Sequence, residues 1–202
     1  IADRKRLLVQ TPEQMQKRYR IDVRTRHEVL SIDRQRKELI VRNLTTGEET
    51  GEPYDAVVLS PGAEPVRPPI AGADSPGVHT LRNLEDMDHI KRQVDEGDVG
   101  RALVVGGGYI GLEMAEALRE REVPGTLVEL LPQVFSAADE EMVAPIHAEL
   151  RRNGVDLRLR TSVTEIRPES ERLGVVRRDG GQGDAGRVLL TVGAQPANYL
   201  AG

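Results

Sequence analysis

The sequence predicts an α/β protein with a doubly wound, parallel β-sheet over its larger, C-terminal part. Two observations support this prediction. Short apolar runs of the kind that form buried parallel strands, such as residues 102–105 and 126–128, alternate with helical patterns at residues 112–119 and 139–152. Alternation in this order predicts right-handed crossovers between parallel strands. In addition, a glycine-rich turn joins the first of these strands to its helix.

The composition limits the class of protein. With 202 residues, the chain is long enough for one large domain or two small ones. Aromatic residues make up only 2% of the chain, so the core must consist of Val, Leu, Ile and Ala. No apolar run approaches the ~18 residues of a membrane span, and we recognise no signal peptide. We therefore expect a cytoplasmic protein without membrane contact.

Charge and the lack of cysteine exclude further classes. The formal net charge of −5 argues against a nucleic-acid partner, and no aromatic residues interleave with basic ones for base stacking. The Arg- and Lys-rich residues 1–42 are interpreted as a solvated surface, with a site for an anionic partner as the alternative. The absence of cysteine excludes disulfides, thiolate metal sites and thiol nucleophiles from this chain. Its four histidines are scattered, so we expect no metal site.

The N-terminal third predicts a β-rich segment. A helix begins at Pro12, with Thr11 as its N-cap, and runs to about Tyr19. Strands are expected at residues 21–23, 28–33 and 38–43, the last two as a hairpin across residues 34–37, with another turn at residues 46–48. Residues 54–60 form an apolar run, which predicts a strand buried on both faces.

The remaining elements follow a proline-rich linker at residues 64–76. A helix is expected from about Asn83 to Asp95. The helix that Asp139 caps carries apolar residues at helical spacing, namely Met142, Val143, Ile146 and Leu150. Further strands are expected at residues 155–159, 162–166, 173–177 and 187–192, with a glycine-rich turn at residues 180–186. Part of this region forms a small antiparallel excursion from the main sheet.

The chemistry of the chain is concentrated in the turn that follows residues 102–105. The turn has the spacing G-x-G-x-x-G and consists of Gly106, Gly107, Gly108, Tyr109, Ile110 and Gly111. In such a turn the first glycine allows the tight bend, the second lets the backbone approach a pyrophosphate, and the third lets helix and strand pack closely. Free amides at the helix N-terminus then meet the phosphate charge. Between a strand and a helix, this pattern predicts a dinucleotide site.

A second signal supports the glycine pattern. Glu129 ends the next predicted strand about eighteen residues after Gly111, close to the roughly twenty expected for an acidic ribose-binding residue. A carboxylate there accepts hydrogen bonds from ribose hydroxyls and repels a 2′-phosphate, which Leu130 and Leu131 cannot neutralise. The sequence therefore predicts NADH rather than NADPH. The alternative is a structural glycine turn with a solvated glutamate.

Four motifs together give the chain a family resemblance. They lie at residues 59–63 with the proline-rich run behind them, and at residues 105–116, 128–133 and 192–196. In these motifs the chain resembles the FAD-dependent pyridine nucleotide-disulfide oxidoreductases, in particular the coenzyme A-disulfide reductase and NADH oxidase branch. The likeness covers nearly the whole chain.

The resemblance implies roles for individual residues. Tyr109 would lie over the flavin until nicotinamide displaces it, and Glu113 would lie near the nicotinamide. Backbone groups of Val192 and Gly193 would face the nicotinamide side. The residues expected where the chain leaves the flavin domain are Ser60, Pro61 and Gly62. Alternatively, Tyr109 is a packing residue and Glu113 an ordinary residue near a helix N-terminus, where a carboxylate is favoured.

The chain also departs from the family pattern. It has no second G-x-G-x-x-G near Ile1, no redox-active cysteine, no later Gly-Asp flavin motif and no C-terminal dimerisation domain. We therefore expect residues 1–77 to be a partial FAD-domain segment, residues 78–196 to be the NAD(H)-binding domain, and residues 197–202 to begin the return to the FAD domain. No catalytic residue is expected in this chain.

The function implied by the resemblance is that of an NADH-dependent flavoprotein oxidoreductase. Hydride would pass from NADH to FAD and then to a disulfide, CoA-disulfide, polysulfide or O₂. This chain would supply the NADH-binding portion and would not hold FAD by itself. The competing class is a non-catalytic NAD(H)-binding module or sensor. The expected partners are NADH and a small-molecule acceptor, and self-association into a homo-oligomer remains open.

Overall fold

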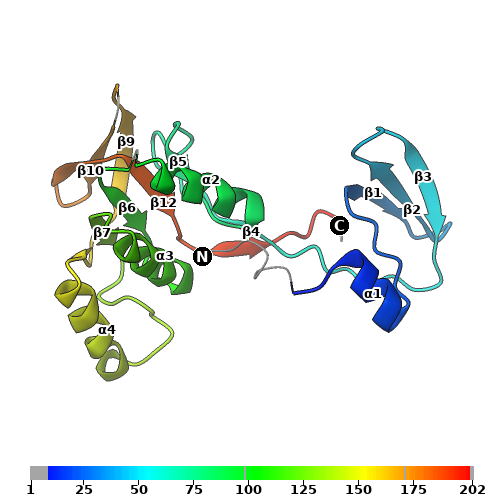
Figure 1. Cartoon of the computed structure of the whole chain (residues 1–202), viewed down its shortest axis with the longest axis horizontal. Coiled ribbons are helices and arrows are strands. Elements are labelled where there is room, and N and C mark those ends of the chain that lie inside the picture. The colour runs from blue at the N-terminus through cyan, green and yellow to red at the C-terminus, as the bar shows by residue number, and fades with distance from the viewer. Residues whose placement is uncertain (1–8, 98, 171, 201–202) are drawn as a thin grey trace. The chain divides into compact units, whose positions relative to one another are not determined.

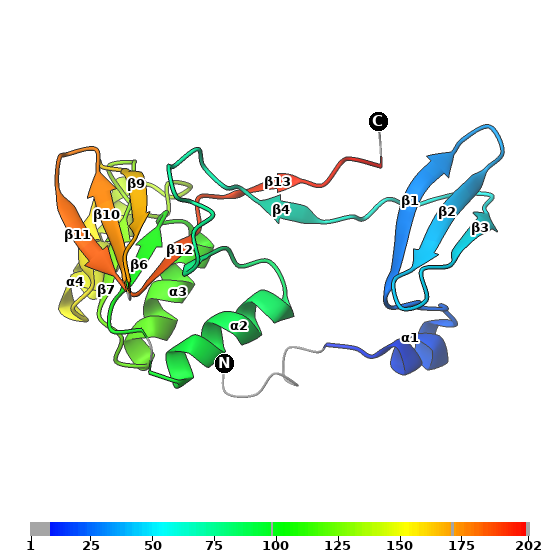
Figure 2. The same cartoon turned by 90° about the horizontal axis from the view of Figure 1, so that it is seen from above.

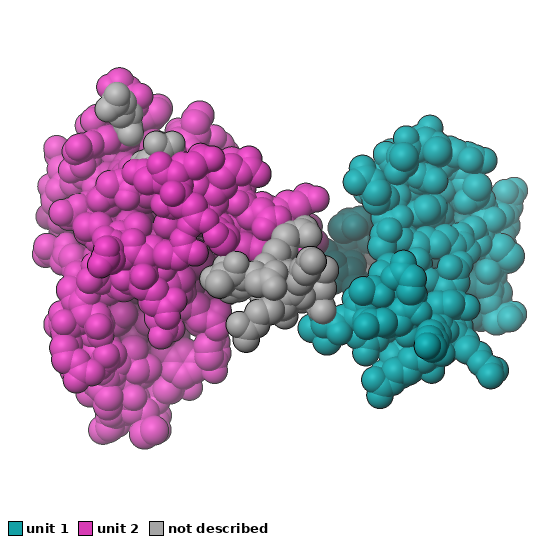
Figure 3. Space-filling view, in the orientation of Figure 1, with its two compact units in different colours: residues 1–63, 196–202 teal, residues 64–195 magenta. Residues whose placement is uncertain are grey.

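The computed structural model describes residues 9–97, 99–170 and 172–200 (Figure 1). The chain forms two compact units, which Figure 3 distinguishes by colour. Unit 1 comprises Ile1–Ala63 and Pro196–Gly202, and unit 2 comprises Glu64–Gln195. The larger sheets each lie within one unit.

Unit 2 is built on a five-stranded parallel sheet. Its strands are β5 (Val78–His79), β6 (Ala102–Val105), β7 (Gly125–Val128), β8 (Asp156–Arg158) and β12 (Arg187–Leu190), in the order β5-β12-β6-β7-β8. All four residues of the central β6 are buried. A strand covered on both faces must be apolar along its whole length, which is why an uninterrupted Ala-Leu-Val-Val run forms it.

Two different layers cover this sheet (Figures 1 and 2). One face packs against α2 (Leu84–Asp95), α3 (Tyr109–Glu120) and α4 (Glu140–Arg152), which contribute residues to one apolar core cluster. The other face packs against an antiparallel sheet of β9 (Val163–Pro168), β10 (Leu173–Arg177) and β11 (Gln182–Ala185), which contributes to a second cluster. The predicted antiparallel excursion is confirmed, and it packs on one face of the parallel sheet.

Helices α2 and α4 begin at the predicted residues, whereas α3 begins at Tyr109, three residues before the predicted start at Leu112. The predicted buried face of α4 also needs a correction. Asn83 caps α2 in a reciprocal capping box with Asp86. In α4, Val143 is fully buried in the core, whereas Met142 is 71% exposed. The prediction that Met142 lies on the apolar face is wrong. Adjacent positions on a helix lie about 100° apart, so the neighbour of a central core residue turns toward solvent.

Two predicted loops of unit 2 contain ordered structure. Within the expected linker, β4 (Ala63–Pro65) pairs with β13 (Ala194–Pro196). Further along, Ala73 is buried in the core and Ala71 O accepts a hydrogen bond of 2.7 Å from Ile166 N. Most of the expected turn at residues 180–186 is the strand β11, which pairs with β10. The strand was not predicted, because its sequence has glycine and no apolar alternation. Hydrogen bonding to β10 stabilises it instead.

Unit 1 contains a helix and a three-stranded antiparallel sheet. The helix α1 (Pro12–Tyr19) begins at a capping box between Thr11 and Gln14, as predicted from the Thr-Pro pair. The sheet has the order β1-β2-β3, with β1 (His27–Asp33), β2 (Glu38–Asn43) and β3 (Glu49–Pro53). The predicted hairpin of β1 and β2 is confirmed. Residues 21–23 form no strand, and β3 was missed because its sequence lacks apolar alternation.

The prediction of a buried strand at residues 54–60 is wrong. These residues have no strand structure, and Val58 is 88% exposed. Among the residues that the structure describes, no strand pairs with them. An apolar run becomes a buried strand only where neighbouring strands satisfy its backbone groups.

The compact units divide between Ala63 and Glu64 and between Gln195 and Pro196. The first division lies earlier than the expected domain boundary at residue 77, because Ile70 and Ala73 pack on the core of unit 2. Residues 1–8 and 201–202 of the predicted segments lie outside the described residues. Within the described part of the chain, no helix is long and apolar enough to span a membrane.

Candidate dinucleotide site

The glycine turn lies at the carboxyl end of β6. Gly106 has a φ of +105°, and a Cβ atom there would lie 2.5 Å from Thr191 O, so both the backbone angle and the close approach require glycine. Its amide donates to Val128 O at the end of β7 (2.8 Å). The turn is therefore held between β7 and the segment after β12, at the sheet edge where ligands of open α/β folds bind.

The other two motif glycines differ in what surrounds them. Gly111 is buried in α3, and a Cβ there would lie 2.0 Å from Gly106 O, so it permits the helix to pack on the turn. Gly108 is the N-cap of α3, and a Cβ atom there would have no neighbouring atom within 4 Å. This open space lies beside the first amides of α3, which have no partner within the helix and attract negative charge. The geometry fits a pyrophosphate.

Glu129 lies next to the turn with its carboxylate oriented by two backbone amides. Its Oε2 accepts a hydrogen bond from Gly107 N (2.6 Å), and its Oε1 accepts one from Leu131 N (2.8 Å). Its own amide donates to Arg158 O (2.8 Å), which fixes the backbone at the end of β7. Each carboxylate oxygen has a further lone pair, so the group remains able to accept two hydroxyl hydrogen bonds.

Thr191 is a part of the site that sequence reasoning missed. Its Oγ1 lies 3.0 Å from Val105 O and 2.9 Å from Gly106 O, and its one hydroxyl hydrogen is shared between these two acceptors. Its amide donates to Val105 O (2.8 Å). Thr191 thereby joins the end of β12 to the glycine turn, which lies far away in sequence. The available signal was a polar residue directly after the buried strand Arg187–Leu190.

The loop after Glu129 folds back onto the glycine turn, which the sequence also did not indicate. Phe135 N donates to Gly107 O (2.8 Å), and the side chain of Val134 is fully buried. Val134 N in turn donates to Nε2 of His147 on α4 (3.2 Å). Burial, and then the Arg151 guanidinium, hold the pKa of His147 below its ordinary value. The neutral imidazole is the form that accepts this bond.

Tyr109 lies at the surface of the turn. It is 70% exposed, and its ring meets that of Phe135 edge-on at 4.5 Å between centroids. Ile110 and Leu130 are also exposed, as is Glu113 one turn further along α3. The exposed apolar side chains give the site a surface that a flat ring system can cover.

The remaining predicted residues divide between the units. Val192 is partly exposed after β12, and Gly193 O accepts a hydrogen bond from Val66 N (2.9 Å). The predicted flavin-side residues Ser60, Pro61 and Gly62 are exposed and belong to unit 1. Within unit 2, the structure thus brings together the glycine turn, Glu129 and the end of β12. Among the described residues, no group of three His, Asp or Glu side chains is arranged to hold a metal.

The parallel sheet and the glycine turn at its carboxyl edge define a Rossmann-type α/β protein. The chain belongs to the pyridine nucleotide-disulphide oxidoreductase family, whose sequence profile matches residues 2–201. The family and the fold class predicted from the sequence are thereby confirmed.

Individual relatives agree with this assignment. A coenzyme A disulfide reductase of Staphylococcus aureus (strain JH9) is 38% identical over 166 residues, which are 82% of this chain and 37% of that protein. The structure of reduced CoADR-RHD of Bacillus anthracis has a TM-score of 0.94 at 39% identity, over 100% of this chain and 36% of that one. The NADH-bound, water-forming NADH oxidase of Lactobacillus brevis has a TM-score of 0.90 at 29% identity, over 98% and 43%. The chain therefore spans little more than a third of its curated relative.

Proposed function

We propose that this chain is the NADH-binding portion of a flavin-dependent oxidoreductase. The observation that carries the proposal is the Glu129 carboxylate, held by Gly107 N at the end of β7 beside the open space at Gly108. The relatives support it, because one is an NADH oxidase bound to NADH and another is a coenzyme A disulfide reductase. NADH supplies a hydride when bound, and this chain's residues bind and orient it.

Each part of the nucleotide has a proposed position. The pyrophosphate lies at Gly108 and the first amides of α3, and the adenosine ribose hydroxyls donate to Glu129. Tyr109, Glu113 and the Val192–Gly193 backbone face the nicotinamide. Thr191 and Phe135 hold the turn through Gly106 and Gly107 and do not themselves contact the ligand.

The proposal predicts a preference for NADH over NADPH. Glu129 repels a 2′-phosphate, so NADH should raise the thermal midpoint more than NADPH at equal concentration. A ligand at 100 times its Kd stabilises the folded state by about 2.7 kcal/mol. Differential scanning fluorimetry measures both shifts, and Glu129→Ala should reduce the difference between them. Equal or stronger stabilisation of the wild-type chain by NADPH would contradict the role of Glu129.

The proposed reaction also needs electron acceptors. We propose FAD as the first acceptor and a disulfide, CoA-disulfide, polysulfide or O₂ as the second. Ser60, Pro61 and Gly62 alone offer no enclosed flavin site, since all three are exposed. The chain by itself is thus proposed to bind NADH without turnover.

A non-catalytic NAD(H)-binding module is the second candidate function. It is considered because the 202 residues include no cysteine that could pass electrons from a flavin to a disulfide. Flavin absorbance near 450 nm distinguishes the two for the full-length protein, as does NADH oxidation with a disulfide or O₂. The second candidate is supported if the protein binds NADH but carries no flavin and does not oxidise NADH.

A further inference from the structure

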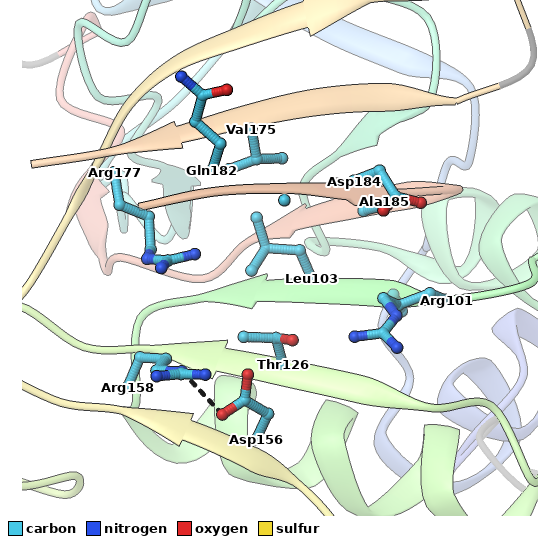
Figure 4. Close-up of a pocket in the computed structure, with 12 residues that line it drawn as sticks. Arg101, Leu103, Thr126, Asp156, Arg158, Val175, Arg177, Gln182, Asp184 and Ala185 are labelled. Carbon is cyan, nitrogen blue, oxygen red and sulfur yellow. Dashed lines mark ion pairs between the residues drawn. The ribbon is translucent and has the colours of Figure 1, made fainter. Parts of the chain in front are cut away.

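A polar cavity lies within unit 2, between the parallel sheet and the antiparallel sheet. Its volume is about 220 Å³, and its lining includes Arg101, Thr126, Asp156, Arg158 and Arg177. No residue of the glycine turn lines it, nor does Glu129. Figure 4 shows that β6, β7 and β8 form one wall and the antiparallel strands form the other.

Strand register explains why the space between the sheets becomes polar here. Leu103, Thr126 and Asp156 form one row across β6, β7 and β8, and Val105, Val128 and Arg158 form the next. Residues of one row point to the same face of a sheet. The apolar core cluster between the two sheets includes Leu103, Val105 and Val128. The apolar cluster therefore ends at β8, where the two rows end in the charged residues Asp156 and Arg158.

On the opposite wall, Arg177 at the end of β10 lines the cavity. This side chain is only 17% exposed, and its Nε lies 3.4 Å from Asp179. A Cβ atom on Gly181 would lie 1.9 Å from its Nη2, and one on Gly183 would lie 4.0 Å from its Nη1. The absence of a side chain at Gly181 thus leaves room for the guanidinium, whereas a Cβ at Gly183 would make only an ordinary contact with it. The terminal nitrogens of Arg177 face the cavity (Figure 4).

The charge of the cavity is positive. Asp156 pairs with Arg158 (2.8 Å), and Asp184 pairs with Arg172 (2.9 Å), which does not line the cavity. Both lining carboxylates are thereby paired, and Arg177 is paired with Asp179, which does not line the cavity. Among the described residues, Arg101 has no carboxylate partner, so the lining keeps a net positive charge. In Figure 4 the guanidinium groups of Arg158 and Arg177 reach from the two sheets toward the same side of the cavity. Each of the two contacts its aspartate through Nε, so its terminal Nη groups remain as donors for an anion in the cavity.

We propose that this cavity binds the phosphate group of a small phosphorylated polyol. Guanidinium groups present paired N–H donors that match phosphate oxygens, and Arg158 and Arg177 supply them from opposite walls. The Thr126 hydroxyl adds a neutral donor, and Asp156 retains acceptor capacity for a ligand hydroxyl. The cavity is distinct from the proposed NADH site, because no residue proposed to contact NADH lines it, although Arg158 O accepts the hydrogen bond of the Glu129 amide.

Nuclear magnetic resonance titration of the ¹⁵N-labelled full chain tests the proposal, with inorganic phosphate, ribose 5-phosphate and ribose as probes. Ribose 5-phosphate should shift the amides of Thr126, Asp156 and Gly183 saturably, phosphate should do so more weakly, and ribose should have no effect. Arg177→Gln should raise the Kd about tenfold, since it removes a charge-assisted hydrogen bond. Arg178→Gln, an equal charge change at the adjacent residue, which does not line the cavity, should leave the Kd within about twofold.

A second variant tests the position of the guanidinium without any change of charge. Gly181→Ala should displace the Arg177 guanidinium and weaken ribose 5-phosphate binding, and it also serves if Arg177→Gln fails to fold. The proposal is overturned by the absence of saturable shifts at these amides, by equal effects of Arg177→Gln and Arg178→Gln, or by shifts confined to residues 106–111. The last outcome would place the phosphate at the glycine turn alone.

Discussion

At the scale of single residues, Gly108 and Gly111 form a natural pair for separating binding from folding. Both belong to the same motif, yet a Cβ at Gly108 would meet open space and one at Gly111 would meet the Gly106 carbonyl at 2.0 Å. The first position therefore borders the proposed pyrophosphate, and the second lies within the packed junction of helix and turn.

We predict that Gly108→Val abolishes NADH binding while its circular dichroism spectrum stays native. Its φ of −76° suits a residue with a side chain, and the added methyl groups would fill the space that the pyrophosphate needs. Gly111→Ala is the matched comparison and should lower the free energy of unfolding by about 1–3 kcal/mol through overpacking. Calorimetric NADH titration and urea unfolding measure the two effects. Normal NADH affinity in folded Gly108→Val would place the nucleotide elsewhere.

At the scale of elements, α4 supports the glycine turn through a chain of two hydrogen bonds. His147 accepts from Val134 N, and the next residue, Phe135, donates to Gly107 O. These two hydrogen bonds thus connect α4, the loop and the glycine turn. The first of them requires a neutral His147 imidazole, because a protonated Nε2 cannot accept a hydrogen bond.

This coupling predicts a pH dependence of stability. Burial and Arg151 lower the pKa of His147 in the folded state, and Glu140 acts in the opposite direction. The unfolded state therefore binds the proton more readily. The contribution of His147 is complete above its unfolded pKa of about 6.5 and is lost as the pH falls through the lower, folded value.

Urea unfolding between about pH 7.5 and pH 5 measures the effect. His147→Gln keeps an acceptor that does not titrate, so its unfolding free energy should fall less on acidification than that of the wild type. Burial also lowers the pKa of His79, which adds a slope of the same sign to both proteins. Identical pH profiles for the two proteins would contradict the contribution of His147 titration to the pH dependence of stability.

At the scale of the whole molecule, the two units differ in how well their apolar residues are covered. Unit 2 has apolar clusters on both faces of its parallel sheet, whereas Val57, Val58 and Leu59 of unit 1 are exposed. Exposed apolar backbone without strand partners invites pairing with another chain.

We therefore predict that amides of residues 103–105 exchange with solvent far more slowly than those of residues 57–59 in a monomeric sample. The former exchange only through costly opening of a packed sheet. Hydrogen exchange followed by mass spectrometry measures both, and sedimentation confirms the monomer. Slow exchange at both segments in the monomer would contradict this difference, while slow exchange that appears only with self-association would identify residues 57–59 as an interface.

The features that the sequence determined by itself are those with local causes. The Thr11 cap, the buried run of β6 and the glycine spacing each depend on residues within one turn or strand, where backbone sterics and local hydrogen bonds decide the conformation. Glu129 belongs with them, because the distance from the turn to the end of the next strand is set by the length of one βα unit.

Only the tertiary structure decided the features that depend on distant partners. Thr191 and His147 reach the glycine turn from segments that no local pattern connects with it. The strand β11 exists because β10 offers its backbone groups, and residues 54–60 remain exposed because no described strand does so for them. An apolar pattern indicates that a segment is suited to a buried strand. Whether the segment forms that strand depends on whether other strands lie beside it and pair with its backbone.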